Sequence, residues 1–460
     1  MANQSFKLLE YLKTQELLFR EATRQLSTNR GKESFSNAAE WMQDNFYLVQ
    51  QTCRQIGEDM PPGFYRQLPK ITTGTLNGYP RIYAIAQELV VTSGTHLDID
   101  HVKRFVHLYQ DLTPLTTGEL WALPVMLRLG LVEFLAQTVS RITDLPGANS
   151  LPTLTLPHAI TDDEIVANCI ISLQTLATQD WQLFFESVSR VEHILRDDPA
   201  NIYAKMDRET RDRYRKVIEK LAHATGKEEQ HVAREAICLA QEAKSRPGLE
   251  PARDSSELES PRAAHVGYYL LDAGRTQLDA RIGYRVPVSA RVRRWALNHP
   301  TPVYLGGIGL FALIILLAGI IYARDADTNF PQWVGAELLL LIPALTVSVS
   351  LIDWIVSLTI PPRVLPKMDF ENGIPAECQT LVVIPSLLTS ATEVKSLLKE
   401  LELHFLRSQD AHLYFALLTD LPDTPQPRRS SADTWVELAA TGIRALNEKY
   451  HREKIGRAHV

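Results

Sequence analysis

The sequence predicts a mainly α-helical protein that ends with the start of an α/β domain. Apolar residues recur every three or four positions through most of residues 1–245, which is the period of an amphipathic helix. Two long apolar stretches follow, at about 302–323 and 333–360. Short β-branched runs then alternate with an amphipathic helix. We therefore expect a cytoplasmic helical array, a two-helix transmembrane hairpin and an incomplete α/β domain, in that order.

The composition excludes several classes of protein. The 460 residues carry a net charge of −6, whereas a nucleic-acid-binding protein is usually basic, so we expect no nucleic-acid partner. The N-terminus is amphipathic and charged and lacks the apolar core of a secretory signal, so we expect it in the cytoplasm. The cysteines have no C-x-x-C spacing, which argues against a zinc site and favours a reducing compartment. They are Cys53, Cys169, Cys238 and Cys378.

Three segments of the helical region, residues 1–245, depart from a simple amphipathic helix. Residues 119–142 form an apolar helix with Pro124 in its first turns, which predicts a kink or a late start. Residues 162–195 predict a helix interrupted near Asp180. The densely charged segment that begins at Met206 predicts a solvated helix.

Two segments connect this region to the membrane. Residues 246–262 are rich in Pro, Ser and Glu and predict a linker. Residues 263–300 predict further helix that ends in SARVRRWALNHP. Three arginines beside a tryptophan, directly before an apolar run, are typical of a membrane-interface segment.

Residues 301–360 predict a transmembrane hairpin. Each of the two spans is long enough to cross the hydrocarbon core of a bilayer. Glu337 and Asp353 lie near the ends of the second span, where they can reach headgroups or water. The Gly306-Gly307-x-Gly309 cluster has no strand before it, so we interpret it as a site of close helix packing rather than a nucleotide loop.

The orientation of the hairpin follows from the basic residues beside it. The flanks carry most of them and the connecting loop carries only Arg324, so both flanks should be cytoplasmic and the loop external. The flanking residues are Arg291, Arg293, Arg294, Arg363 and Lys367.

After a second linker, residues 361–376, residues 377–454 predict a βαβ unit. Residues 380–385 form a buried strand, Ser390 and Glu393 form a capping box before a helix, and residues 412–420 form a second strand. The two strands should be parallel, which brings the Pro385-Ser386 turn and Asp420 to the edge of the sheet where ligands bind. The alternative is that Asp420 and Asp423 cap a turn.

Several long motifs together resemble the cyclic β-1,2-glucan synthases. They are NAAEWMQDNFYLVQQTCRQIGEDMPPGFYRQLPKI, GYPRIYAIAQEL, TPLTTGELWALPVMLRLGLVE, HVGYYLLDAGR, IPPRVLPKMDFENGIPAECQTLVVIPSLLTS and YFALLTDLPD. The resemblance runs from about residue 35 to 454 and implies an inner-membrane enzyme that makes cyclic β-1,2-glucan from UDP-glucose. It implies that residues 377–454 begin a GT-A-type, inverting glycosyltransferase domain, with a phosphorylase-like domain further on.

The resemblance transfers few site residues. Asp420 matches the first acid of the transferase domain and Asp423 is a second candidate for contact with the nucleotide sugar. The catalytic base and the D-x-D motif that binds Mg²⁺ or Mn²⁺ are expected downstream, so we expect this chain alone to bind no metal and to be inactive. Asp98-Ile-Asp100 opens a helix, so Asp98 is interpreted as an N-cap, and Asp325-Ala-Asp327 lies in the external loop.

Residues 63–89 combine aromatic and cationic side chains around a Thr/Gly-rich loop. Tyr65, Arg66, Arg81 and Tyr83 carry these groups. One interpretation is packing and domain docking. The other is contact with the glucan or with the transferase domain, since tyrosine stacks on sugar faces and arginine binds hydroxyls or phosphate.

Two further functions stay open. One is a non-catalytic helical scaffold anchored by the hairpin, and the other is a different processive polysaccharide synthase. Residues 455–460, IGRAHV, resemble translated adapter DNA, so we expect this tail to be non-native and the natural protein to continue. The expected partners are UDP-glucose, β-1,2-glucan and the lipid bilayer, and the expected location is the bacterial inner membrane with both ends inside.

Overall fold

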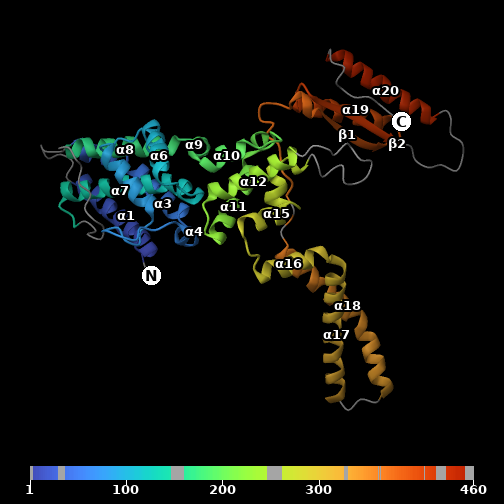
Figure 1. The fold of residues 1–460 in the computed structure, drawn as a ribbon. Helices are drawn as coiled ribbons and strands as arrows, with labels where there is room; N and C mark the ends of the chain where they lie inside the picture. The colour runs from blue at the N-terminus through green and yellow to red at the C-terminus, as the bar shows by residue number, and fades with distance from the viewer. Residues whose placement is uncertain are drawn as a thin grey trace. The chain divides into compact units, whose positions relative to one another are not determined.

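The computed structural model is mostly helical, with one small sheet (Figure 1). It describes residues 4–28, 37–146, 160–245, 262–325, 330–360, 362, 364–408, 410–420 and 431–450. Most of the predicted linker 246–262, the candidate Asp423 and the tail 455–460 lie outside these residues. The chain divides into two compact units, one of Met1–Ala204 with Arg211–Val364 and one of Lys205–Thr210 with Leu365–Val460.

The first unit contains the predicted helical array. Its helices before the hairpin are α1 (Gln4–Thr28), α2 (Asn37–Asp44), α3 (Phe46–Asp59), α4 (Pro62–Gln67), α5 (Arg81–Thr92), α6 (Ile99–Leu112), α7 (Thr117–Thr143), α8 (Asp162–Thr178), α9 (Trp181–Val188), α10 (Arg190–Arg196), α11 (Arg208–Thr225), α12 (Glu229–Lys244), α14 (Val266–Leu271), α15 (Arg275–Ile282) and α16 (Val288–Asn298).

Helix α7 is the centre of the array, because α1, α3, α5 and α8 all pack against it. It is long and apolar enough to cross a membrane, yet its apolar window is 89% buried, as expected of a helix that is hydrophobic all round and lies in a core. The predicted late start is wrong. A capping box of Thr116 and Glu119 starts the helix at Thr117, well before Pro124.

The predicted interruption near Asp180 is confirmed. Helix α8 ends at Thr178, and the Asp180 carboxylate then accepts hydrogen bonds from the backbone N–H groups of Gln182 and Leu183 to start α9. A second break occurs at Ser189, whose side chain caps α10.

The prediction of a solvated helix after Met206 is wrong for one face of α11. Arg211, Tyr214, Arg215 and Ile218 are all buried. Helical spacing places them on one side, and buried acids supply partners for the two arginines. Counting charges along the segment could not separate this face from the exposed one.

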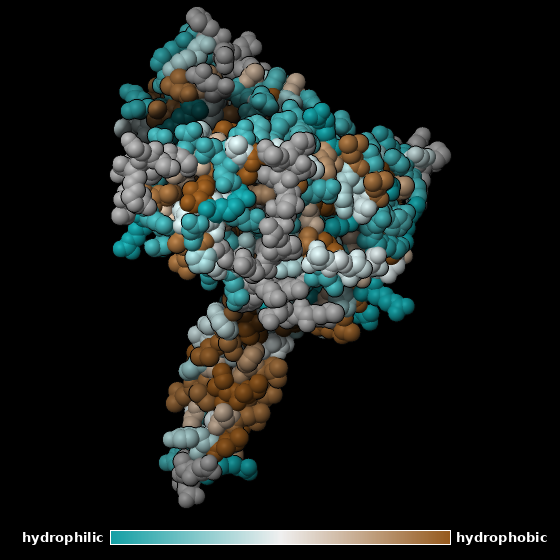
Figure 2. Space-filling view, turned by 90° about the vertical axis from the view of Figure 1, so that its left-hand side faces the viewer, coloured by the Kyte–Doolittle hydropathy of each residue, from teal (hydrophilic) through white to brown (hydrophobic). Residues whose placement is uncertain are grey.

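Helices α17 (Pro300–Asp325) and α18 (Phe330–Thr359) form the predicted hairpin and are long and apolar enough to cross a membrane. They lie side by side (Figure 1) and present an apolar surface (Figure 2). The predicted close packing is confirmed at Gly307, where a Cβ would come within 2.8 Å of the Ile352 side chain, but it is wrong for Gly306 and Gly309, where nothing lies within 4 Å of an added Cβ. The Tyr304 hydroxyl also donates to the Asp353 carboxylate across the pair, at 2.9 Å.

The second unit contains the βαβ element. Strands β1 (Thr380–Leu387) and β2 (Leu413–Asp420) are parallel, as predicted, and helices α19 (Ala391–Arg407) and α20 (Ser431–Lys449) contribute to the core beside them. The predicted Pro385-Ser386 turn is wrong, because β1 continues to Leu387, which pairs with Asp420. The Ser390 side chain accepts from the Glu393 N–H, while the Glu393 carboxylate bonds to Thr389.

A short segment from between α10 and α11 also belongs to the second unit. Met206 forms an antiparallel bridge with Met368. The Asp207 N–H donates to the Lys367 carbonyl at 3.0 Å, and the Asp369 N–H donates to the Lys205 carbonyl at 2.8 Å. Residues 205–210 therefore pair with the chain that follows the hairpin.

Candidate functional site

The aromatic and cationic segment, residues 63–89, closes a tight loop between α4 and α5. The Ile71 N–H donates to the Tyr79 carbonyl at 2.9 Å and the Arg81 N–H donates to the Pro69 carbonyl at 2.8 Å. The loop tip contains Gly74 and Gly78, both with positive φ, a conformation that favours glycine. The pairing fixes the positions of the predicted contact residues on either side.

Tyr83 lies in the core and contacts a buried acid. Its side chain is fully buried, and its hydroxyl donates to the Glu133 carboxylate at 2.8 Å to Oε1 and 3.0 Å to Oε2. The Gln87 amide donates to Glu133 Oε2 at 2.9 Å. Burial raises the pKa of Glu133 to about 7, although the bonds from Gln87 and Tyr83 oppose the shift.

The other three predicted residues differ in their surroundings. Tyr65 is buried, and its hydroxyl lies 3.4 Å from the Met126 sulfur. Arg81 makes a bidentate ion pair with the fully buried Glu119, at 2.9 and 2.7 Å. Arg66 is exposed. Tyr65, Arg81 and Tyr83 thus contact other parts of the helical unit, and contact with a glucan stays a prediction.

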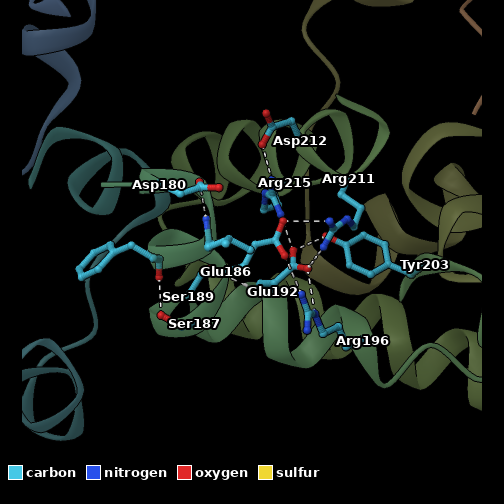
Figure 3. A network of polar contacts seen from close by, with 12 residues as sticks. Asp180, Glu186, Ser187, Ser189, Glu192, Arg196, Tyr203, Arg211, Asp212 and Arg215 are labelled. Atoms are coloured by element: carbon cyan, nitrogen blue, oxygen red, sulfur yellow. Dashed lines mark hydrogen bonds and ion pairs between the residues drawn. The ribbon is translucent and has the colours of Figure 1, made fainter. Parts of the chain in front are cut away.

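A buried ionic cluster joins α10 to α11 (Figure 3). The fully buried Glu192 carboxylate accepts from Arg211 at 2.8 Å, from Arg215, and from the Tyr203 hydroxyl at 2.7 Å. Arg196 reaches the same carboxylate at 3.1 Å. Burial alone would raise the pKa of Glu192, but the nearby arginines and the Tyr203 hydroxyl lower it below its usual value, so the carboxylate stays charged.

A second polar chain runs from Asp198 through His265 to Tyr214. His265 Nδ1 lies 2.8 Å from Asp198 Oδ2, and His265 Nε2 lies 3.0 Å from the Tyr214 hydroxyl oxygen. Asp198 also accepts from the Val266 N–H at 2.9 Å. A Cβ at Gly267 would collide with Tyr214 and His265, so only glycine allows this approach.

A cavity of about 1080 Å³ lies within the first unit, beside the ionic cluster. Its walls come from α4, the N-terminus of α7, α11 and the turn into α12. Arg215 belongs both to this wall and to the cluster around Glu192. The volume is slightly above the range usual for small-molecule sites. The lining includes Phe64, Gly118, Trp121, Lys216, Glu219 and Glu229.

The carboxyl edge of the sheet positions the candidate Asp420. Asp420 ends β2 and is exposed, and its carbonyl accepts from the Leu388 N–H at 2.8 Å. The adjacent β1 residues Ser386 and Leu387 are in register with Thr419 and Asp420. Asp423, the second candidate, is outside the described residues.

Metal ligands are not assembled in the described ranges, which contain no group of three or more His, Cys, Asp or Glu side chains arranged to hold an ion. Asp98 is the N-cap of α6, as predicted, and accepts from the Asp100 N–H at 3.2 Å. Asp325 is the last residue of α17, and Asp327 is outside the described residues.

Comparison with known proteins identifies a relative for most of the chain, although no family model matches it. Cyclic beta-(1,2)-glucan synthase NdvB of Rhizobium meliloti (strain 1021) is 28% identical over an aligned length of 492 positions. The alignment includes 91% of this chain. The chain is similar to a cyclic β-1,2-glucan synthase. This confirms the resemblance that the sequence motifs indicate. The chain spans only 17% of the length of NdvB, so it corresponds to one region of that glucan synthase.

The glucan-synthase motifs did not reveal the ionic cluster or the cavity. The cluster has one sequence signal, since Arg211 and Arg215 are four residues apart on the same helical face as the apolar Ile218. The cavity has none, because Phe64, Gly118 and Glu219 are far apart in sequence and converge only in the folded unit.

Proposed function

We propose that the chain is the N-terminal part of a membrane glucosyltransferase that makes cyclic β-1,2-glucan from UDP-glucose. The observation that carries this proposal is the similarity to NdvB over 91% of the chain. The apolar hairpin α17–α18 supports a place in the bacterial inner membrane, and the basic flanks support an orientation with both ends in the cytoplasm.

Asp420 is the residue we assign to the donor sugar nucleotide. Parallel sheets bind ligands at the carboxyl ends of their strands, and Asp420 ends β2 at this edge. Its carboxylate can accept hydrogen bonds from the ribose hydroxyls or the uracil N–H. Asp423 follows closely in sequence and is the second candidate. The resemblance to the glucan synthases implies that the ligands for Mg²⁺ or Mn²⁺ and the catalytic base follow Asp420 in the complete enzyme.

The donor-binding role is tested with Asp420→Asn in the complete enzyme. Losing hydrogen bonds to a carboxylate should weaken UDP-glucose binding about 5- to 150-fold, as measured by calorimetry. Glu400→Gln is the matched control, because Glu400 is an exposed acid on α19 in the same unit. Equal affinities for wild type and Asp420→Asn would reduce Asp420 to a turn cap.

A non-catalytic scaffold is the second candidate for this chain by itself. The described part of the second unit holds two strands, the βαβ element with which the proposed transferase domain begins, and we propose that this element is inactive by itself. Purified chain incubated with labelled UDP-glucose should therefore yield no glucan. Incorporation of label would place an active site within the chain. A product with another linkage from the complete enzyme would instead favour a different polysaccharide synthase.

A further inference from the structure

The cavity in the first unit has a floor and a rim of different chemistry. The floor carries two half-buried aromatic side chains, Phe64 and Trp121, and the buried Glu229. Exposed charged side chains, Lys216 among them, form the rim. The floor therefore offers apolar ring faces next to polar acceptors, a combination that suits a ligand with both kinds of surface.

Gly118, at the start of α7, is where the walls of the cavity converge. A Cβ at this position would lie 3.3 Å from Glu219 Oε1 and 3.8 Å from Phe64 Cε2. The Glu219 carboxylate and the Phe64 ring thus reach the same point from α11 and α4. Trp121 lies one turn further along α7 and stacks on Phe185 with ring centroids 4.6 Å apart, which fixes its orientation.

The second floor carboxylate is also held in place. Glu229 Oε2 accepts from the Thr117 N–H at 2.9 Å and from the Thr117 hydroxyl at 2.5 Å. Both bonds use Oε2, so Oε1 can accept from a ligand. Burial raises the pKa of Glu219, and raises that of Glu229 to about 7, so Glu229 can also donate a proton to a ligand oxygen at mildly acidic pH.

The charges select the class of ligand. A cation would meet three lysines of the lining, Lys216, Lys220 and the half-buried Lys227, beside the exposed acid Glu228. An anion that passed the rim would meet Glu219 and Glu229 on the floor. A neutral polyol faces neither cost, since its hydroxyls can donate to carboxylates and accept from lysines.

We propose that this cavity binds a stretch of the β-1,2-linked glucan chain, with sugar rings against Phe64 and Trp121 and hydroxyls on Glu219 and Glu229. The choice of glucan rests on the proposed function. The site would hold product or acceptor chain on the helical unit.

The test is calorimetric titration of the purified chain in detergent with short linear β-1,2-linked gluco-oligosaccharides. Wild type should bind. Glu219→Gln, which keeps the shape of the side chain, should weaken binding about 5- to 150-fold by removing a charged acceptor. Phe64→Leu should weaken it roughly 2- to 10-fold by removing the aromatic face. Trp41→Ala is the control, because Trp41 is an exposed aromatic residue on α2 and does not line the cavity.

Three results would overturn the site: no binding by wild type, equal affinities in all variants, or binding of inorganic phosphate in place of the oligosaccharide. Circular dichroism verifies that each variant folds. The outcome is separable from that of the proposed function. If the complete enzyme makes cyclic glucan but this cavity binds no oligosaccharide, the proposed site is wrong and the proposed function stands. If oligosaccharide binding depends on Glu219 but the complete enzyme makes no glucan, the proposed function is wrong and the site stands.

Discussion

Tyr83→Phe tests whether the aromatic and cationic segment holds the core of the helical unit together. The substitution removes one oxygen atom and leaves the ring in place. In the wild type that hydroxyl donates to Glu133 at 2.8 Å, and both side chains are almost completely buried. In the variant, Glu133 keeps the hydrogen bond from the Gln87 amide.

The expected cost follows from the charge of Glu133. A hydrogen bond to a charged group contributes about 1.5–3 kcal/mol, and a neutral one about 1 kcal/mol. Because the pKa of Glu133 is about 7, the cost should be near 1 kcal/mol at acidic pH and about 2 kcal/mol in mildly alkaline buffer, where the carboxylate is charged. About 2 kcal/mol corresponds to a fall in Tm of roughly 3–4 °C for a unit of about 250 to 360 residues.

The assay is thermal unfolding of the chain in detergent, followed by circular dichroism at one fixed scan rate and at two pH values. Tyr47→Phe is the matched control, since Tyr47 is 64% exposed on α3 and the same oxygen is removed there. If Tyr83→Phe melted like Tyr47→Phe, the hydroxyl would not stabilise the fold. The segment would then need another explanation, such as contact with a ligand or another domain.

Three further outcomes are expected. Gly267→Ala should destabilise the chain by about 1–3 kcal/mol or more in the same melts, because the added methyl group overlaps Tyr214. Glu133 and Glu229 have pKa values raised from 4.5 to about 7, so the folded state binds protons more tightly than the unfolded state. The free energy of unfolding should therefore fall as pH rises from about 4.5 to about 7, by up to about 3 kcal/mol per group. Replacing either Glu with Gln should reduce this dependence of stability on pH. In intact cells an impermeant maleimide should label a cysteine introduced into the α17–α18 loop but not Cys378, and labelling of Cys378 would reverse the proposed topology.

The sequence predicted features that depend on local pattern. The parallel pairing of β1 and β2 follows from strand–helix–strand order alone, and the position of Asp420 at the sheet edge follows from where the second strand ends. The hairpin helices follow from length and hydropathy. The break at Asp180 follows from a side chain that caps a new helix.

Features that depend on distant partners could not be predicted in the same way. The helical spacing of Arg215 from Ile218 indicates a buried face, but nothing local in the sequence identifies Glu192 as the partner of Arg215. Glu133 did leave a signal, because an acid inside the apolar helix α7 requires a partner, and Tyr83 supplies one from 50 residues away. A search for acids within apolar helices would have indicated that Glu133 needs a buried partner. That would have favoured packing over glucan contact as the role of residues 63–89.

The pairing of residues 205–210 with the chain after the hairpin has a consequence for biosynthesis. The Lys367 N–H donates to the Thr210 hydroxyl across 157 positions of sequence. Residues 205–210 therefore leave the ribosome long before residues 367–369, and both apolar helices must be translated between the two segments. The entropic cost of closing a loop grows only slowly with its length, so the long separation has little effect on stability. Its main effect is to delay the pairing of the two segments during synthesis. A C-terminal fragment that began at the membrane would lack residues 205–210. The backbone groups of Lys367 and Asp369 would then lose their hydrogen-bond partners in that segment.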